Sequence, residues 1–464
     1  MNRRPKIGLL PLYLKLYDET MPELRREFQP FLDEIAVQFF EKGVDAIRAE
    51  VCRLEPEFHA AVQRFEQEDA DLIVALHLAY SPSLESAAAL AATPLPILLL
   101  DVTMDYSFGP DVDPARIMFN HGIHGVQDLA CMLRRKGKPF EIIAGHYRQS
   151  NALARAADCA RAAFGAKRLR QTKALRIGES FHGMGDFAVA DSTLKEILGI
   201  MVDEVSPKVL IEEINKIDND AIDEEMRLDR EQFSVEAPEE THRRSVRLGL
   251  ALRHYLEKNH YTAFSQNFLA FDSNEGPIDT VPFLEASKAM ARGVGYAGEG
   301  DVLTAALVGA LQCAFGKTTF TEIFCPDWKG GSLFLSHMGE INPETAAQKP
   351  RLIEKDFPWT GARNPAVITC APAPGPAVLV NLAPGPQDSF RLILASVEVL
   401  GDALNTALRD SIRGWIKPSP PLEHFLEAYS RNGGTHHSAL VLGERAEALN
   451  TFAAFAGVEV VRIE

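Results

Sequence analysis

The sequence is poor in cysteine, poor in basic residues and free of long apolar runs, and each shortage excludes a class of protein. Its six cysteines are scattered with no Cys-x-x-Cys pair, so we expect reduced thiols in a cytoplasmic protein and no thiolate zinc site. Lysine and arginine total 48 against 64 acidic residues, which gives a formal net charge of −16. Because binding to nucleic acid draws most of its affinity from basic clusters, nucleic acid is excluded as a partner.

The sequence also contains no apolar stretch long enough to cross a bilayer, so we predict no membrane partner. The basic start leads into a short apolar stretch that Pro11, Lys15 and Asp18 interrupt, which indicates a first strand and no signal peptide. The composition, 46% hydrophobic and 24% charged, is typical of a folded soluble protein, and 464 residues predict two or three domains. An acidic surface of this kind tolerates a neutral ligand such as a sugar.

Strands and helices alternate in the first third of the chain. Their expected positions are strands 6–10, 71–76 and 96–100, and helices 21–41 and 83–92. Fully apolar strands in this order indicate a parallel sheet covered on both faces. Ligands of such sheets gather beyond the carboxyl ends of the strands, where His77, Tyr80 and Asp101 follow.

A second α/β unit begins near Leu169. Its expected elements are a strand at 174–178, a helix at 246–259 and a strand-like run at 261–271. The polar stretch 211–244 between them is rich in glutamate and aspartate. We interpret it as a solvated helical face rather than as an acidic ligand site.

The pattern changes after about residue 317. Short β-rich runs, such as 332–336 and 366–370, are separated by Pro- and Gly-rich turns, which is typical of an antiparallel β domain. The predicted fold class is therefore α/β, with two doubly wound, Rossmann-like domains followed by a mainly antiparallel β domain. The predicted domain boundaries are 1–170, 171–316 and 317–464.

Three stretches carry side chains suited to metal or acid–base chemistry. In the first, residues 293–311, a glycine-rich run ends at Glu299 and an apolar helix begins. Asp301 suits the N-cap of that helix. Glu299 is either a functional carboxylate or one that caps or forms a salt bridge, and local features leave both interpretations open.

The second and third stretches add one carboxylate and three imidazoles. Glu322 lies between two phenylalanines, and His337 follows an apolar run; carboxylates are rarely buried unpaired, so the two together favour a metal or acid–base site. His436 and His437 lead into a strand, so we expect one ring on each face and only one directed at a given site. Such a donor set suits a divalent ion such as manganese, magnesium or cobalt.

These motifs resemble the L-arabinose isomerase family, which is related to the L-fucose isomerases. Gly-Glu-Gly-Asp followed by Thr-Ala-Ala-Leu, a Phe-x-Glu segment, a Ser-His-Met strand end and a late Gly-Gly-x-His-His occur in the family's order and near its spacing. The resemblance is strongest from about 260 to 340 and around 432 to 440. It implies a metal-dependent enzyme that interconverts an aldose and its 2-ketose.

The resemblance also implies the site. Its metal ligands are Glu299, Glu322, His337 and His437 around Mn²⁺, or around another divalent cation such as Mg²⁺ or Co²⁺. The two glutamates move a proton between C1 and C2 through an ene-diol. Further matches near the sugar are Tyr80, His124, Met184, Phe268 and His436. His124 is matched to a histidine that reaches a neighbouring subunit, and a homo-oligomer, a trimer or hexamer, is implied.

The sequence departs from the family pattern in two places. Val302-Leu303 stand where the family has Trp-Lys after Gly-Glu-Gly-Asp, and residues 11–18, PLYLKLYD, replace a sugar-binding motif with glutamine and histidine. The sugar itself is therefore left open. Two alternatives also remain: a sugar epimerase on the same metal site, and a non-catalytic sugar-binding or regulatory protein, since the first two α/β units resemble sugar-binding modules.

Overall fold

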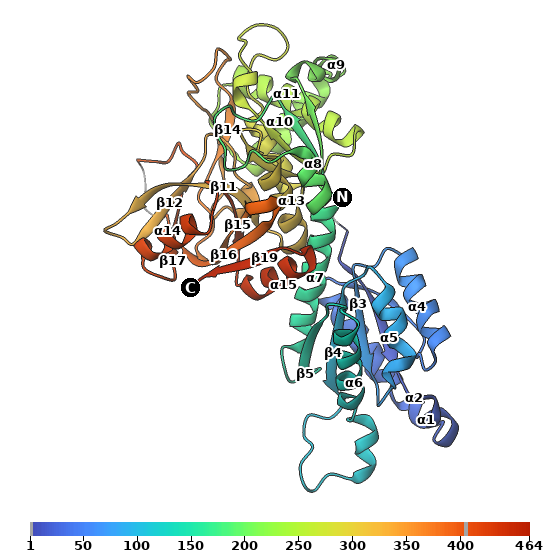
Figure 1. Ribbon diagram of the computed structural model, residues 1–464. Helices are drawn as coiled ribbons and strands as arrows, with labels where there is room; N and C mark the ends of the chain where they lie inside the picture. The colour runs from blue at the N-terminus through green and yellow to red at the C-terminus, as the bar shows by residue number, and fades with distance from the viewer. Residues whose placement is uncertain (1–2, 403–406) are drawn as a thin grey trace. The chain divides into compact units, whose positions relative to one another are not determined.

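The computed structural model describes residues 3–402 and 407–464, which form two compact units (Figure 1). Residues 3–167 make the smaller unit and residues 168–464 the larger one. The predicted division into three domains stays a prediction. No helix in the described residues is long and apolar enough to cross a membrane. Cys52, Cys131, Cys159, Cys325 and Cys370 are free thiols, as predicted.

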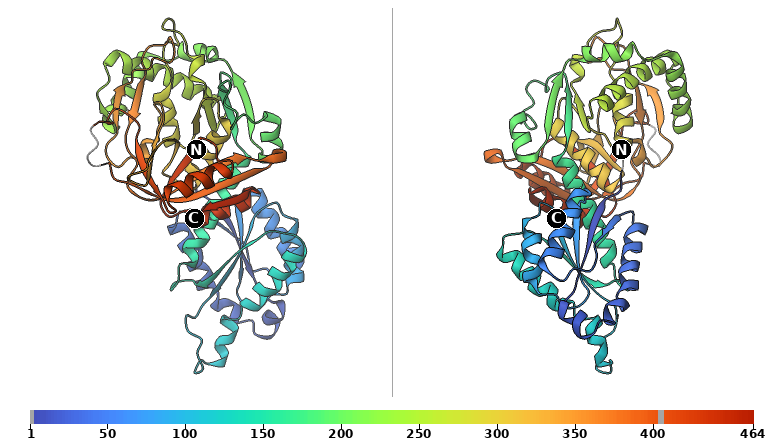
Figure 2. Two further views of the ribbon diagram at one scale, coloured as in Figure 1. Left: turned by 60° about the vertical axis from the view of Figure 1, so that its left-hand side comes forward. Right: turned by 90° about the vertical axis from the view of Figure 1, so that its right-hand side faces the viewer.

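The smaller unit is built on one parallel sheet in the order β2-β1-β3-β4-β5. Its strands are β1 (Lys6–Leu12), β2 (Asp45–Arg48), β3 (Leu72–His77), β4 (Ile97–Thr103) and β5 (Glu141–His146). Helices cover both faces (Figure 2), among them α4 (Glu55–Gln67), α5 (Ser83–Ala92) and α6 (Ile123–Arg135). All six residues of β3 are buried, as a strand covered on both faces requires. The predicted parallel α/β sheet is confirmed.

One predicted helix of this unit is wrong. Residues 21–41 hold two helices, α2 (Leu24–Glu27) and α3 (Gln29–Glu41). Pro30 lies in the first turn of α3, where a backbone N–H has no partner within the helix anyway. A continuous helix through Pro30 would lose a hydrogen bond and clash with the proline ring. The chain therefore starts a new helix at this point.

His77, at the carboxyl end of β3, makes the stability of the protein depend on pH. The side chain is buried, and neither ring nitrogen has a hydrogen-bond partner in the described part of the chain. Burial lowers the pKa of His77 to about 3, although the charge of Asp128 acts in the opposite direction. The folded protein holds the ring neutral, whereas the unfolded chain takes up a proton below pH 6.5. We therefore expect acid to favour unfolding, by about 2 kcal/mol at pH 5 relative to pH 7.

Urea unfolding at pH 5 and pH 7, followed by circular dichroism, measures this effect. His77→Leu should lose the part of the pH dependence that His77 contributes. His59, which is exposed on α4, provides the matched control, because His59→Leu should keep the pH dependence of the parent. The same pH dependence in all three proteins would contradict a neutral, buried His77.

The larger unit contains a parallel sheet in the order β10-β9-β6-β7. Its strands are β6 (Lys173–Ile177), β7 (Met201–Val205), β9 (Ala263–Gln266) and β10 (Gly295–Gly298). Helix α13 (Val302–Phe315), almost wholly buried, packs against β10 and β9. The strand predicted at 261–271 is wrong beyond β9, because the side chain of Asn267 caps a 3-10 turn, Phe268–Ala270.

A barrel-like sheet follows in the order β15-β18-β11-β12-β17-β16-β19, and β15 also pairs with β16. Its strands are β11 (Thr318–Asp327), β12 (Ser332–Ser336), β15 (Gly375–Pro384), β16 (Phe390–Val399), β17 (Gly414–Pro418), β18 (His437–Leu442) and β19 (Glu459–Ile463). Helices α14 (Leu422–Arg431) and α15 (Ala446–Ala456) accompany it. Only the β16–β19 pairing among these is parallel. The predicted mainly antiparallel β region is confirmed.

The polar stretch 211–244 is largely helical and mostly exposed, as predicted, but some of its carboxylates are buried. It folds into α9 (Leu210–Ile214), α10 (Asn219–Gln232), β8 (Ser234–Val235) and the start of α11 (Glu239–Lys258). Strand β8 pairs with a small sheet made of β13 (Arg351–Glu354) and β14 (Ala366–Thr369). Glu225 and Asp229 of α10 are buried and form ion pairs with Lys288 of α12 (Phe283–Ala291). Charges enter a core when they are paired, and this partner lies 59 residues beyond Asp229 in the sequence.

Candidate metal and acid–base site

Three of the predicted ligands meet in the larger unit. Glu299 follows β10, His337 follows β12 and His437 begins β18. One donor atom from each lies within 4.8 Å of the others, and all three residues are buried. Strand β11 lies between β12 and β18 and pairs with both, so the antiparallel register brings His337 and His437 to one end of the sheet.

Glu322, the fourth predicted ligand, lies on β11 beside this group. Its register partners are Ser336 on β12 and His437 on β18. It is half-buried and is not part of the group within 4.8 Å. Burial raises the pKa of Glu322, while the charges of the nearby histidines act in the opposite direction. Its role as a ligand stays a prediction.

The backbone at Glu299 is unusual. Glu299 has a φ of +64°, a left-handed conformation that side chains with a Cβ rarely adopt and that often occurs at functional sites. Its N–H donates to the Gln266 carbonyl at 2.9 Å, and its carbonyl accepts from Phe181 N–H at 2.9 Å. A Cβ at the preceding Gly298 would come within 2.7 Å of His337 Cε1. The glycine therefore lets the backbone approach the imidazole closely.

Each of the three histidines near Glu299 has a carboxylate at its Nδ1. His337 Nδ1 lies 2.7 Å from Glu340 Oε2 and His437 Nδ1 lies 3.0 Å from Asp301 Oδ2, while His436 Nδ1 lies 2.6 Å from Asp186 Oδ2. A carboxylate can only accept, so each Nδ1 carries the proton. In a neutral ring this leaves the Nε2 lone pair available, and we expect this state for the proposed ligands His337 and His437, as in histidines that bind metals.

These residues fit a divalent cation. His437 Nε2 is buried without a hydrogen-bond partner among the described residues, although Glu299 Oε2 is only 3.5 Å away. A coordinate bond from that nitrogen would satisfy it. Contacts with His436 and His437 outweigh the burial of Glu299 and hold the pKa of this carboxyl well below its usual range, so it is ionised. One carboxylate and two imidazoles without a thiolate suit Mn²⁺ or Co²⁺ better than a soft metal.

The expectation for the adjacent histidines is wrong. Both His436 and His437 point their Nε2 at Glu299 Oε2, at 3.6 Å and 3.5 Å. Strand β18 begins at His437, so His436 lies outside the strand and the alternation of faces does not apply to it. Burial would lower the pKa of His436, but its hydrogen bonds with Asp186 and Glu299 outweigh burial and raise that pKa to about 10.

Comparison with known proteins assigns this arrangement to a family. The family model of the L-arabinose isomerase central domain matches residues 176–315, and that of the L-arabinose isomerase C-terminal domain matches residues 317–459. Together the two matches cover more than half of the chain. The chain belongs to the L-arabinose isomerase family. The resemblance read from the sequence motifs is thereby confirmed.

Individual relatives agree over most of the chain. The L-arabinose isomerase of Acidothermus cellulolyticus is 28% identical over 416 residues, which are 84% of this chain and 80% of the relative. The L-arabinose isomerase 1 of Bacillus licheniformis is 28% identical over 86% of this chain and 81% of its own. The L-arabinose isomerase of Clostridium beijerinckii is 29% identical over 76% of this chain and 72% of its own. Their names support an isomerase activity for this L-arabinose isomerase family member.

Of the other residues matched to the L-arabinose isomerases, two lie in the larger unit. Phe268 is buried, with its ring 5.7 Å from that of Phe181, whose N–H bonds the carbonyl of Glu299. Met184 is half-buried three residues after Phe181 and donates its N–H to the Phe181 carbonyl. Phe181 thus connects both residues to the candidate site. Contact with a sugar stays a prediction.

Tyr80 and His124 belong to the smaller unit. The hydroxyl of Tyr80 donates to Asp128 at 3.3 Å, and the His124 ring packs edge-on against His121 at 5.8 Å between centroids. His121, in turn, lies 3.2 Å from the Tyr17 hydroxyl. The substrate-binding roles that the resemblance to the L-arabinose isomerases implies for Tyr80 and His124 stay predictions.

Three carboxylates of the site were missed by sequence reasoning. Asp301 was expected only as an N-cap; it does cap α13, through the Thr304 N–H, but its second oxygen holds His437. Glu340 follows His337 by three residues, and this spacing is a signal that could have found it. Asp186 is 250 residues from His436, and nothing in the sequence connects them.

The substitution Asp301→Asn tests whether the carboxylates that hold the histidines of the site matter for metal binding. The two oxygens of Asp301 accept from the Thr304 N–H and from His437 Nδ1, and an amide has only one oxygen for both. We therefore expect the affinity for Mn²⁺ to fall by about 10–100-fold, as calorimetric titration measures. Asp218 is the matched control, because it caps α10 through the Ala221 N–H and Asp218→Asn should leave the affinity unchanged. Equal affinities in both variants would count against Asp301 as a positioning residue.

Proposed function

We propose that this protein is a metal-dependent aldose–ketose isomerase, which moves a proton between C1 and C2 of a sugar through an ene-diol. One observation carries the proposal: Glu299, His337 and His437 bring their donor atoms within 4.8 Å of one another in a member of the L-arabinose isomerase family. Isomerisation needs a group that takes a proton from one carbon and returns it to the next. Carboxylates can do both.

The proposed cofactor is Mn²⁺, or another divalent cation such as Mg²⁺ or Co²⁺. Glu299, His337 and His437 would hold it, with Glu322 as the fourth ligand from β11. When bound, the cation stabilises negative charge that develops on the sugar oxygens. Asp301 and Glu340 keep the two ligating rings in the required tautomer and orientation.

Proton transfer, the positioning of Glu299 and contact with the sugar are assigned to side chains of the larger unit. Glu299 and Glu322 are the proposed acid–base pair, and they come from different elements, the turn after β10 and strand β11. His436, held by Asp186, presents its Nε2 3.6 Å from Glu299 Oε2 and fixes the position of that carboxylate. Phe268 and Met184 are the proposed apolar contacts of the sugar in this unit.

The proposed partners follow from the same resemblance. The substrate is a small sugar, a pentose, hexose or deoxy sugar. Tyr80 and His124 are the proposed sugar contacts of the smaller unit, and His124 is proposed to serve the site of a neighbouring subunit. The protein is proposed to work as a homo-oligomer, a trimer or hexamer, in the cytoplasm. The whole chain carries a formal net charge of −16, which does not oppose a neutral ligand.

Metal removal tests the proposed function. The full-length protein is incubated with a panel of aldoses and ketoses, L-arabinose included, before and after treatment with EDTA, and products are identified by chromatography. We expect a ketose from an aldose, loss of turnover after chelation and its return with Mn²⁺. An epimeric aldose would favour the epimerase instead. Sugar binding without turnover would favour a non-catalytic sugar-binding protein. Turnover that is unchanged by EDTA would contradict the proposed metal dependence.

A further inference from the structure

A polar cavity of about 240 Å³ in the larger unit, away from the candidate metal site, is lined by four arginines. Arg243, Arg244 and Arg247 come from α11, and Arg363 comes from the segment between β13 and β14. None of these is among the residues of the candidate metal site. Four guanidinium groups around a small cavity are unexpected in a chain with a formal net charge of −16.

The two carboxylates of the lining do not neutralise these arginines. Glu240 lies 3.2 Å from Arg363 and 3.5 Å from Arg244, but its side chain is 80% exposed. Asp279 lies 3.8 Å from Arg363. Both carboxylates thus contact Arg363, and the lining holds four positive charges and two negative ones. A third carboxylate, Asp223 outside the lining, forms an ion pair with Arg243. Water screens the exposed Glu240 contacts further.

One arginine of this cavity has unused donors. The side chain of Arg247 makes no hydrogen bond and no ion pair with any residue in the described ranges. Arg244 is only 10% exposed; its Nη2 donates to the Asn364 carbonyl at 3.1 Å, yet its Nε is buried without a partner among the described residues. The guanidinium of Arg247 therefore has donors available to an acceptor from outside the chain, whereas the Nε of Arg244 is closed off from one.

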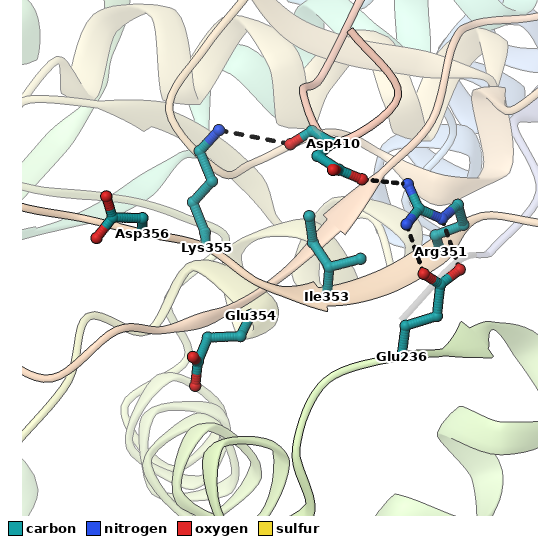
Figure 3. A pocket seen from close by; sticks show the side chains of 7 residues that line it. All are labelled: Glu236, Arg351, Ile353, Glu354, Lys355, Asp356 and Asp410. Atoms are coloured by element: carbon teal, nitrogen blue, oxygen red, sulfur yellow. Dashed lines mark hydrogen bonds and ion pairs between the residues drawn. The ribbon is translucent and has the colours of Figure 1, made fainter. Parts of the chain in front are cut away.

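Another polar cavity, of about 600 Å³ beside β13, differs from the arginine cavity in how its cations are paired (Figure 3). There Arg351 donates to both carboxylate oxygens of Glu236, at 2.7 Å and 2.6 Å, and to Asp410 at 2.7 Å. Lys355 donates to the Asp410 carbonyl at 3.4 Å. The cations of that cavity are paired with protein oxygens, whereas those of the arginine cavity are only partly paired.

We propose that the arginine cavity binds a phosphate group, carried by inorganic phosphate or by a small phosphomonoester. Guanidinium groups donate in planar forks that match phosphate oxygens. Arg243 and Arg244 are successive on a helix and Arg363 approaches from another segment, so their donors converge from several directions. That arrangement suits a tetrahedral dianion better than one planar carboxylate. The cavity is smaller than the roughly 300 Å³ at which sites for drug-sized ligands begin, so the ligand is small.

Calorimetric titration of the full-length protein tests this proposal, with inorganic phosphate, glucose 6-phosphate and acetate as separate probes. We expect one saturable site per chain for both phosphate compounds, and weaker binding of acetate. A sugar phosphate that binds more tightly than inorganic phosphate would identify a phosphomonoester as the ligand; equal affinities would mean that the phosphate group alone is recognised. Tighter binding of acetate would overturn the choice of phosphate.

Matched variants locate the binding. Arg247→Gln should weaken phosphate binding by at least about tenfold, because it removes a charged donor. Arg227→Gln removes the same charge from α10 outside the cavity and should leave the affinity unchanged. If Arg247→Gln does not fold, Arg363→Gln, in an irregular segment, replaces it. Equal affinities in parent and cavity variant, or equal losses in both arginine variants, would overturn the site. Binding is read without turnover, so this result is independent of the proposed isomerase activity.

Discussion

Replacing Glu322 by glutamine is expected to lower aldose turnover by roughly 10²–10⁴-fold. The amide keeps the size of the side chain on β11 but cannot accept and return a proton. Glu299→Gln should have a loss of the same order, because that carboxylate lies 3.5 Å from His437 Nε2 at the centre of the candidate site. Steady-state kinetics with the substrate identified in the sugar panel measures both losses.

Glu398 provides the control for these variants. It is an exposed glutamate on β16 of the same barrel, so Glu398→Gln should leave turnover unchanged. If Glu299 and Glu322 act as a pair, the double variant should be little worse than the slower single variant, since groups that work as a unit are not additive. Full activity in Glu322→Gln, with the fold intact by circular dichroism, would remove Glu322 from the proposed acid–base pair.

Replacing Lys288 by methionine is expected to cost about 3–5 kcal/mol of unfolding free energy. Lys288 is buried on α12, where it forms ion pairs with Glu225 and with Asp229, the latter at 2.5 Å. Without it, two carboxylates of α10 stay buried with less compensation. Burial would raise the pKa of Glu225, but Arg253 and Lys288 outweigh burial and lower that pKa to about 2, so this carboxylate is charged at neutral pH.

Lys216 provides the matched control for this substitution. It pairs with the exposed Glu212 and with the buried Glu213, which keeps Lys258 as a second partner, and 48% of the Lys216 side chain is exposed, so Lys216→Met should change stability little. Urea unfolding at pH 7, followed by circular dichroism, compares the two variants with the parent. Similar midpoints for Lys288→Met and Lys216→Met would show that the buried pairs contribute no more than surface pairs do.

The accuracy of the sequence predictions depended on how local their physical cause is. The predicted helix 83–92 and strand 332–336 coincide with α5 and β12, because apolar spacing and turn residues act within a few positions. The prediction of a solvated helical face for 211–244 missed the burial of Asp229, because that burial depends on Lys288, which lies outside the stretch. The strand predicted at 261–271 failed where the side-chain oxygen of Asn267 accepts from the Leu269 N–H and ends the extended run.

By itself, the sequence pointed to three stretches that carry carboxylates and imidazoles suited to metal or acid–base chemistry. The resemblance to the L-arabinose isomerases, which the family match confirms, then implied Glu299, Glu322, His337 and His437 as the ligands. Only the tertiary structure decided that both His436 and His437 face Glu299. It also decided that Asp301, 136 residues from His437, orients that ring. Hydrogen bonds across such separations leave no periodic trace in a chain, because they depend on how strands pair and not on the spacing of neighbours.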